Sequence, residues 1–375
     1  MFRLGCGVAA VLAWMCFGTA ASPAAEKPSN EFRQALPGFQ FTFPRDFYSH
    51  DDFRIEWWYY TGHLEAEPGR SFGYQLTFFR VAVEGGRKID NPSRWKVGQI
   101  YFAHMTLSDL NNGKFYFFER INRAGVGQAG AASDRLHVWN ENWSLTGQGK
   151  AHRLVASEGE VGLDLHLTPS KPLVIHGKNG VSQKGDAPGT ASHYFSFTRM
   201  PTEGQVTLKD QTFQVKGLSW MDHEFSSSQL SEDQVGWDWF SIQLDNGTEL
   251  MLYSLRKRDG TIEPHSGGTW VAAEGRATPL GLSDYTVRAT GQWTSPRSGA
   301  VYPAGWILGV NKYDLRLTVT PEMNGQELHH LRSISSSYWE GSVRVTGTVA
   351  GQPVQGRGYV ELVGYSKALK QALPD

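Results

Sequence analysis

The sequence predicts an all-β fold of two tandem antiparallel β-barrels, and three observations support this prediction. Segments of about five to ten residues rich in Tyr, Phe, Trp, Val and Thr recur between turns of Gly, Asn, Asp and Pro. Helical periodicity is almost absent, and one Trp-rich hairpin occurs twice. Closing consecutive hairpins into a barrel removes exposed edges, and a barrel of about eight to ten strands can enclose one small ligand.

The N-terminus has the pattern of a cleaved signal peptide. Arg3 precedes an apolar run at 4–18, and small residues follow at 19–25. The run is shorter than the roughly 20 residues that a membrane-spanning helix needs. We therefore expect a signal peptide at 1–25, a linker at 26–40, and a periplasmic or secreted mature chain with no integral membrane span. Both cysteines, Cys6 and Cys16, lie in the removed segment, which excludes disulfides, thiolate nucleophiles and cysteine-ligated zinc.

The expected strands alternate with turns along the whole chain. Two of the turns, at 111–113 and 245–247, end in Asn-Gly and supply the positive φ angles of tight hairpins. The candidate strands are 56–64, 71–83, 99–107, 114–120, 162–168, 239–244, 249–256, 313–320 and 343–349.

An internal duplication divides the chain into two halves. The hairpin from Trp58 to Arg80 has a counterpart from Trp239 to Arg256, with offsets of 181 and 176 residues at its two ends. Two related barrels explain this repeat more simply than one large sheet. We place an N-terminal barrel at 41–210 and a C-terminal barrel at 211–368, with the boundary within 200–216.

Composition excludes several classes of function. The net charge is −1, with 36 basic and 37 acidic residues and no long runs, so nucleic acid is not an expected partner. No glycine-rich phosphate cradle, His-Glu-x-x-His spacing or Gly-x-Ser-x-Gly elbow occurs, so we expect neither a cofactor nor a metal. The 13 tryptophans must fill cores, line a pocket, or do both.

Glu56 is the first candidate for chemistry. Strand alternation places Glu56, Trp58 and Tyr60 on one face and the residues between them on the other, and one face must be the barrel interior. A dehydrated Glu56 carboxyl would have a raised pKa and could act as an acid. Alternatively, Glu56 forms a structural ion pair with Arg80.

A second cluster of ionisable and aromatic residues lies at 220–239. Here His223 could exchange protons while Asp222 or Asp238 sets its tautomer, or the cluster could be an interdomain hydrogen-bond network. Acids also stand beside aromatics at 338–341 and 356–362, which are either pocket residues or simply barrel-closing strands. The catalytic candidates are Asp222, His223, Glu224, Asp238 and Tyr253, and the candidate ligand-binding residues are Glu56, Trp58, Tyr60, His104, Trp220, Trp237, Trp239, Tyr338, Trp339 and Glu340.

Several of these motifs together resemble a known family. They are Phe-Pro-Arg-Asp at 43–46 with His50, the segment 56–62, the pair at 119–120 with the tripeptide at 129–131, and the segments 220–224, 236–239 and 339–341. Over about 43–365 the chain resembles the two-domain lipocalin-like proteins related to carotenoid 1,2-hydratase (CrtC/AttH-like), many of which are labelled predicted secreted hydrolase. The resemblance implies two packed lipocalin-like barrels with a cleft or barrel mouth for apolar molecules.

The resemblance also implies specific catalytic residues. The hydratases have a His, a Trp two positions later, and a Tyr-x-Asp whose acid protonates the alkene. Here His223 and Tyr253 match, whereas Phe225 replaces the Trp and Leu255 replaces the acid. Any hydration would then need another acid, taken from Asp222, Glu224, Asp238 or Glu56.

Three functions remain open from the sequence. The first is an extracytoplasmic protein that binds a hydrophobic, lipid- or isoprenoid-like molecule and works with an ATP-binding-cassette (ABC) transport system. The second is a hydratase, isomerase or cyclase that protonates an isoprenoid double bond with a buried carboxylic acid. The third is a secreted hydrolase that uses water activated by Asp or Glu.

Overall fold

The computed structural model describes residues 32–83, 97–228 and 230–368. The expected signal peptide and the first part of the expected linker lie outside these residues. Within them, regular structure is almost entirely antiparallel β, interrupted by short 3₁₀ helices at Arg45–Phe47, Leu282–Asp284 and Asn311–Tyr313. No helix among the described residues is long and apolar enough to cross a membrane.

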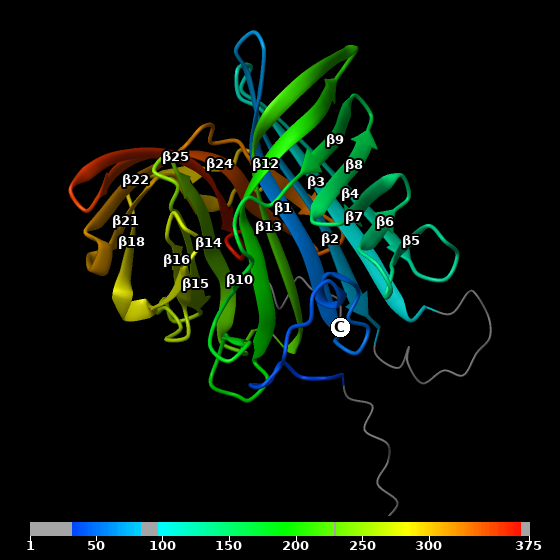
Figure 1. Ribbon diagram of the computed structural model, residues 1–375, viewed down its shortest axis with the longest axis horizontal. Helices are drawn as coiled ribbons and strands as arrows, with labels where there is room; N and C mark the ends of the chain where they lie inside the picture. The colour runs from blue at the N-terminus through cyan, green and yellow to red at the C-terminus, as the bar shows by residue number, and fades with distance from the viewer. Residues whose placement is uncertain (1–31, 84–96, 229, 369–375) are drawn as a thin grey trace, which may run out of the picture. The chain divides into compact units, whose positions relative to one another are not determined.

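The first sheet has 13 strands, with β1, β13 and β12 side by side at its centre (Figure 1). Its order is β4-β3-β2-β1-β13-β12-β9-β8-β7-β6-β5, and β10 and β11 also pair with β12. The strands are β1 (Ile55–Ala66), β2 (Arg70–Ala82), β3 (Gln99–Asp109), β4 (Lys114–Arg123), β5 (Ala129–Ala131), β6 (His137–Asn140), β7 (Trp143–Gln148), β8 (Ala151–Glu158), β9 (Val161–Leu167), β10 (Val174–Ile175), β11 (Ser182–Gln183), β12 (Ala191–Leu208) and β13 (Gln211–Ser228).

Side chains from the two ends of this sheet meet, so the sheet is a nearly closed barrel. Asn122 in β4 donates from Nδ2 to Oδ1 of Asn140 in β6 at 2.7 Å, and Arg120 donates to the Asn140 carbonyl at 3.0 Å. Near-closure leaves few unpaired backbone groups at the sheet edges.

The second sheet has 10 strands, in the order β17-β16-β15-β14-β25-β24-β22-β21-β18, with β23 pairing with β24. A separate two-stranded sheet joins β19 and β20. The strands are β14 (Gln234–Leu244), β15 (Glu249–Lys257), β16 (Gly267–Val271), β17 (Ala277–Gly281), β18 (Tyr285–Ala289), β19 (Gln292–Thr294), β20 (Val301–Pro303), β21 (Trp306–Val310), β22 (Leu315–Pro321), β23 (Glu327–Leu331), β24 (Ser336–Val349) and β25 (Gln352–Leu362).

The predicted all-β class is confirmed, and each expected strand is present, although the strands expected from residues 239 and 343 begin earlier, at Gln234 and Ser336. The turns at 111–113 and 245–247 have the expected positive φ, at Gly113 and Gly247. The change of sheet comes later than residue 210, because β13 pairs along β1 and β12, and the second sheet begins at β14. The division into two folding domains stays a prediction.

The interior of the first barrel is a packed core. Trp58 and Tyr60 of β1 are 1% and 0% exposed and belong to a large buried apolar cluster with residues from β2, β3, β9 and β12. The face of β1 that carries Glu56 therefore points inward, and the face that carries Trp57 and Tyr59 points outward.

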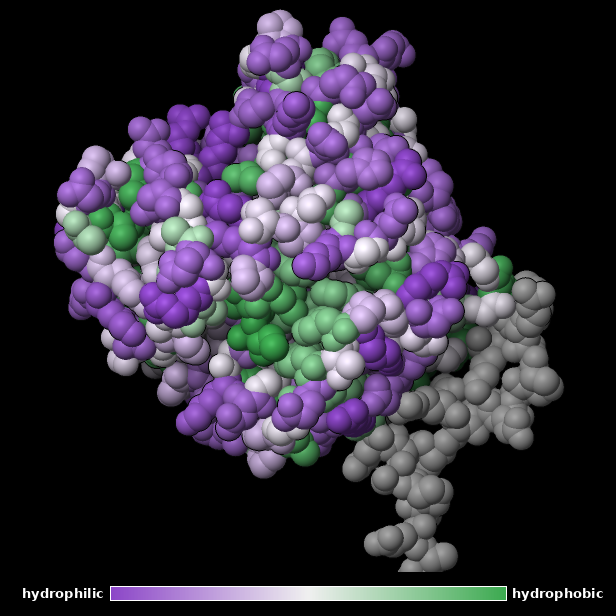
Figure 2. All heavy atoms as spheres, viewed as in Figure 1, coloured by the Kyte–Doolittle hydropathy of each residue, from purple (hydrophilic) through white to green (hydrophobic). Residues whose placement is uncertain are grey.

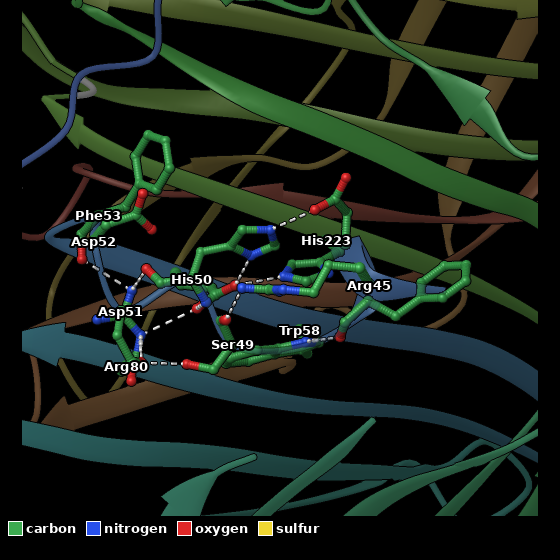
Figure 3. A network of polar contacts seen from close by, with 12 residues as sticks. Arg45, Ser49, His50, Asp51, Asp52, Phe53, Trp58, Arg80 and His223 are labelled. Atoms are coloured by element: carbon green, nitrogen blue, oxygen red, sulfur yellow. Dashed lines mark hydrogen bonds and ion pairs between the residues drawn. The ribbon is translucent and has the colours of Figure 1, made fainter. Parts of the chain in front are cut away.

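Glu56 is fully buried and bonded to His50, Arg80 and His223. Figure 3 shows the polar network around these three labelled residues. The Oε2 atom of Glu56 accepts from Arg80 Nε at 3.0 Å, and its Oε1 atom lies 2.7 Å from His50 Nδ1 and 2.8 Å from His223 Nε2. Arg80 also donates to the carbonyls of His50 and Phe53 at 2.8 and 3.0 Å. The network joins β1 to β2, to β13 and to the segment before β1.

The charges in this network decide the ionisation of Glu56. Burial raises the pKa of the carboxyl, but the charge of His50, the hydrogen bonds from His223 and His50 and the charge of Arg80 together hold the pKa well below its usual range. Of the two alternatives for Glu56, the geometry therefore supports the structural ion pair with Arg80.

Hydrophobic side chains remain uncovered near β10. Figure 2 shows them gathered on the viewed face. Ile175 is 43% exposed and pairs with Phe195, whose ring lies 5.1 Å from that of the partly exposed Phe43. The segment before β1 thus covers this end of the barrel incompletely.

We expect Glu56→Gln to lower the free energy of unfolding by about 3–5 kcal/mol, because it leaves the Arg80 guanidinium buried without its counter-charge. Urea unfolding followed by circular dichroism measures the change. The matched control is Asp164→Asn, which breaks a half-exposed ion pair with Arg153 and should cost at most about 1 kcal/mol. Equal losses in the two variants would contradict this role for Glu56.

Candidate functional site

A cavity of about 100 Å³ lies where the outer face of the first sheet meets the second sheet. Aromatic rings and carboxyl groups from both sheets form its wall. The lining residues are Trp57, Tyr59, Thr77, Phe79, Lys184, Tyr194, Asp222, Glu224, Leu230, Trp237, Trp239, Tyr253, Leu255 and Glu361.

Strand alternation explains why these side chains converge. On β13, Asp222 and Glu224 point to the side opposite His223, which is held inside the barrel by Glu56. On the second sheet, β14 lies between β15 and β25; β14 and β15 each contribute two alternate residues to the cavity, and β25 contributes Glu361. The register pairs Trp239 with Tyr253 on one side and with Glu361 on the other.

Asp222 is the buried acid at the centre of the wall. Its Oδ1 atom accepts from Trp220 Nε1 at 2.7 Å and from the Ser196 hydroxyl. Burial raises the pKa of Asp222 to about 7, although hydrogen bonds from Ser196, Trp220 and Tyr194 oppose the rise, and the charge of Glu224 adds to it. All three of these donors are neutral, so they offset only part of the desolvation.

Glu224 has a cationic partner instead. Lys184 Nζ lies 3.1 Å from Glu224 Oε1, and the Ser192 hydroxyl donates to the same oxygen. The ammonium also lies 4.5 Å from the ring centroid of Tyr253 and 5.3 Å from that of Tyr194. The cavity therefore contains one ion pair beside a separate acid.

Two further carboxyl groups come from the second sheet. Glu361 accepts from Trp237 Nε1 at 2.7 Å, and burial raises its pKa to about 7. Glu340, just behind the wall, accepts from the Tyr59 hydroxyl at 2.8 Å, and its other oxygen has no hydrogen-bond partner among the described residues. Burial and the charge of Glu361 raise the pKa of Glu340 well above its usual value. These are the properties of carboxyl groups that hold protons near neutral pH.

The cavity includes some of the residues expected from the sequence. Asp222, Glu224, Tyr253, Trp237 and Trp239 line it directly. Two others lie immediately behind it: Trp220 donates to Asp222, and Glu340 accepts from Tyr59.

The structure places the other candidates elsewhere. Glu56, Trp58, Tyr60 and His223 face the barrel interior. Asp238 points away from the cavity and is paired with Arg256 at 2.9 Å.

Three further candidates lie in other clusters. His104 is bound to the Tyr338 hydroxyl at 2.9 Å in a second contact between the sheets, outside the cavity. Trp339 belongs to the core of the second sheet.

His223 and Tyr253, the two residues that match the hydratase pattern, do not meet. His223 faces the inside of the first barrel and Tyr253 faces the cavity. Leu255, at the position of the family's acid, does line the cavity, and so does Glu361. The cavity thus holds acids, but at other positions than the resemblance implies.

Sequence reasoning missed several lining residues. Trp57 and Tyr59 were visible as the alternate face of a Trp-rich strand, but alternation alone did not tell which face was inside. Glu361 was noted beside aromatics without being assigned to the site. Lys184 and Leu230 lie in segments outside the strands, where no periodicity could have indicated them.

Two groups of side chains among the described residues come close enough to share a metal ion: His50 with Glu56 and His223, and Asp186 with Glu263 and His265. In the first group both imidazoles already bind Glu56, whose charge Arg80 balances. In the second, Glu263 is bound by Lys257 at 3.2 Å.

Comparisons with known proteins agree on one family of folds. A family model described as AttH-like matches residues 34–365. A solved Nitrosomonas europaea protein described as AttH is 34% identical, with a TM-score of 0.80, and the match covers 89% of this chain and 99% of that one. The search of curated proteins found no match.

Two more distant structures share the fold. Kievitone hydratase from Nectria haematococca is 17% identical, with a TM-score of 0.65 over 90% of this chain and 99% of that one. CghA with Sch210972 is 13% identical, with a TM-score of 0.56 over 88% and 95%. At these identities the likeness shows the fold alone.

We expect Asp222→Asn to remove a pH dependence of stability. The folded protein holds a proton on Asp222 up to about pH 7, whereas the unfolded chain releases it near pH 4, so the contribution of Asp222 to wild-type stability falls as the pH rises between these values. The unfolding free energy of the variant minus that of the wild type should therefore increase by on the order of 4 kcal/mol from pH 4 to pH 7.

Urea titrations at several pH values measure this difference. Asp186→Asn, which changes a fully exposed carboxylate, serves as the control and should run parallel to the wild type. If the unfolding free energy of Asp222→Asn also ran parallel to that of the wild type across the pH range, the raised pKa of Asp222 would be contradicted.

Proposed function

This chain belongs to the AttH-like family, and from that premise we propose that it is an acid-dependent enzyme that hydrates, isomerises or cyclises an unsaturated, isoprenoid-like molecule bound between the two sheets. The observation that carries the proposal is the raised pKa of Asp222 in the wall of an aromatic cavity. A carboxylic acid that keeps its proton near neutral pH is the group that protonation of an alkene requires.

Proton transfer is the first step. Trp220 and Ser196 both donate to Oδ1 of Asp222, so the proton is expected on Oδ2. Transfer of this proton to one carbon of the double bond forms a C–H bond, leaves Asp222 as a carboxylate and creates a carbocation on the other carbon.

The aromatic wall suits the cation that follows. Trp57, Trp237 and Trp239 line the same cavity as Asp222, and indole faces attract positive charge. Lys184 already lies near two tyrosine rings of this wall, so the cavity is built to hold a cation beside aromatic faces.

Completion of the reaction requires a base. For hydration, water adds its oxygen to the carbocation and gives a proton to the Glu224 carboxylate, which Lys184 pairs in the cavity. Loss of a neighbouring proton to the same group would instead give an isomerised alkene. The proton then returns to Asp222 through exchange with solvent, so the net change is addition of one water or none.

Two comparisons bear on the proposal. The name of kievitone hydratase supports a hydration reaction on this fold. The presence of Leu255 where the related hydratases carry their acid means that the substrate would be protonated from another direction, by Asp222.

We expect wild-type protein in D₂O to incorporate deuterium into at least one member of a panel of prenylated and isoprenoid alkenes, detected by mass spectrometry. Asp222→Asn should lower the rate by about 100-fold or more, because a general acid contributes roughly 10²–10⁴. The control is Glu327→Gln, which changes a buried acid of the second sheet that is bound by Ser295 and Tyr302 outside this cavity. Turnover that survives in Asp222→Asn would overturn the assignment.

A second candidate function uses the same cavity without chemistry. The aromatic lining and the signal-peptide pattern favour an extracytoplasmic carrier that holds a lipid- or isoprenoid-like molecule and delivers it to an ABC transport system. Such a carrier should copurify with its ligand from the periplasm or medium of its native host, and Trp239→Ala should release the ligand. Mass spectrometry of solvent extracts tests this, and a protein that is cytoplasmic or reproducibly empty would contradict it.

A further inference from the structure

His176 is a buried histidine outside the cavity that contacts the residue behind the acid. It follows β10 and is 2% exposed. Its Nε2 atom lies 2.7 Å from the Ser196 hydroxyl, and its Nδ1 atom lies 2.8 Å from the hydroxyl of Thr269 in the second sheet. Ser196 in turn donates to Asp222. A single chain of hydrogen bonds therefore runs from Thr269 through His176 and Ser196 to Asp222.

The direction of these hydrogen bonds follows from the acceptor at the end. An ionised Asp222 can only accept, so the Ser196 hydroxyl donates to it. The Ser196 oxygen then accepts from His176, which requires the proton on Nε2, and Nδ1 accepts from the Thr269 hydroxyl. Every donor in the chain points toward Asp222.

The imidazole is held neutral, as this arrangement requires. Burial, followed by the charge of Lys184, lowers the pKa of His176 to about 3. A neutral ring with one N–H fits the chain, whereas a charged ring would donate from both nitrogens and would turn Thr269 into an acceptor.

We propose that His176 is a positioning residue for the acid: by donating to Ser196 it fixes the hydroxyl rotor so that Ser196 donates to Oδ1 of Asp222, which stabilises the Asp222 carboxylate and leaves Oδ2 for the proton. The inference rests on the proposed function for its catalytic meaning. The hydrogen-bond chain itself can be tested without a substrate.

Groups on the neighbouring elements also affect the pKa of Asp222. Their effect must be distinguished from that of the hydrogen-bond chain through His176 and Ser196. They include residues of its own strand, residues of β1, β12, β24 and β25, and the segment after β11. These groups are Trp220, Glu224, Tyr59, Tyr194, Glu340, Glu361 and Lys184. Substitution of His176 leaves all of them in place, so a change in Asp222 that follows it reports on the chain.

The experiment measures the titration of Asp222 directly. Infrared difference spectra over a pH series follow the C=O band of its protonated carboxyl, identified by its absence in Asp222→Asn. Ser196→Ala should raise the pKa of Asp222 by about one unit, since it removes a hydrogen bond to a charged group. His176→Leu should raise it in the same direction by roughly half a unit, because Ser196 loses its orientation and polarisation.

The conservative variant separates positioning from packing. In His176→Gln the amide can donate to Ser196 and accept from Thr269, so the pKa of Asp222 should return close to the wild-type value. Thermal unfolding is recorded for each variant, because a merely structural histidine would change stability without moving the titration. If His176→Leu does not fold, Thr269→Val, which removes the hydroxyl that sets the tautomer, takes its place and should also raise the pKa.

The outcomes are distinct. A raised pKa in His176→Leu with recovery in His176→Gln supports the positioning role, whatever the substrate assays give. An Asp222 titration that is unchanged in His176→Leu, or in Thr269→Val if that variant is used, overturns it. If Asp222→Asn keeps full turnover, the proposed function fails while the titration result still stands.

Discussion

The Glu56 carboxylate, buried with Arg80, His50 and His223, is the interaction that sets the orientation of the neighbouring strands. Because side chains alternate along a strand, fixing Glu56 inside the barrel turns Trp57 and Tyr59 outward. Fixing His223 inside does the same for Asp222 and Glu224 on β13. One internal network therefore determines which aromatics and acids reach the cavity between the sheets. A shift of one residue in β1 or β13 would exchange the core face with the cavity face.

Glu56 and Asp222 show how partners decide the state of a buried acid. Both are almost completely removed from solvent, and burial raises the pKa of each. The charges of His50 and Arg80 and the hydrogen bonds from His223 and His50 outweigh the desolvation of Glu56, whereas the hydrogen bonds to Asp222 come from neutral donors and the charge of Glu224 raises its pKa further. One acid is thus a fixed charge that holds strands together, and the other has a pKa raised to about 7. They lie on adjacent strands and face opposite sides of the same sheet.

The all-β class could be predicted well because side-chain alternation, Asn-Gly turns and the Trp-rich hairpin are each visible within a short stretch of sequence. The site was only partly predictable. The sequence placed Asp222, Glu224, Trp237 and Trp239 in one cluster, but it could not separate them from His223, since neighbouring residues in a strand face opposite ways. Lys184 and His176 come from segments with no regular period, and Glu361 from the end of the chain. Their meeting depends on long-range packing between the sheets, which no local signal records.

Because the interior of the first barrel is filled, the residues that form its core are not the residues that line the cavity. In a barrel that encloses a ligand, the same residues must do both. In such a barrel, a substitution that reshapes the binding site also alters the hydrophobic core. Here Trp58 and Tyr60 belong to the core, while the cavity is lined by the outward residues of the same strand and by the second sheet. Substitutions on the outward face can therefore reshape the cavity with little loss of folding stability, and the acids that line it come from both sheets.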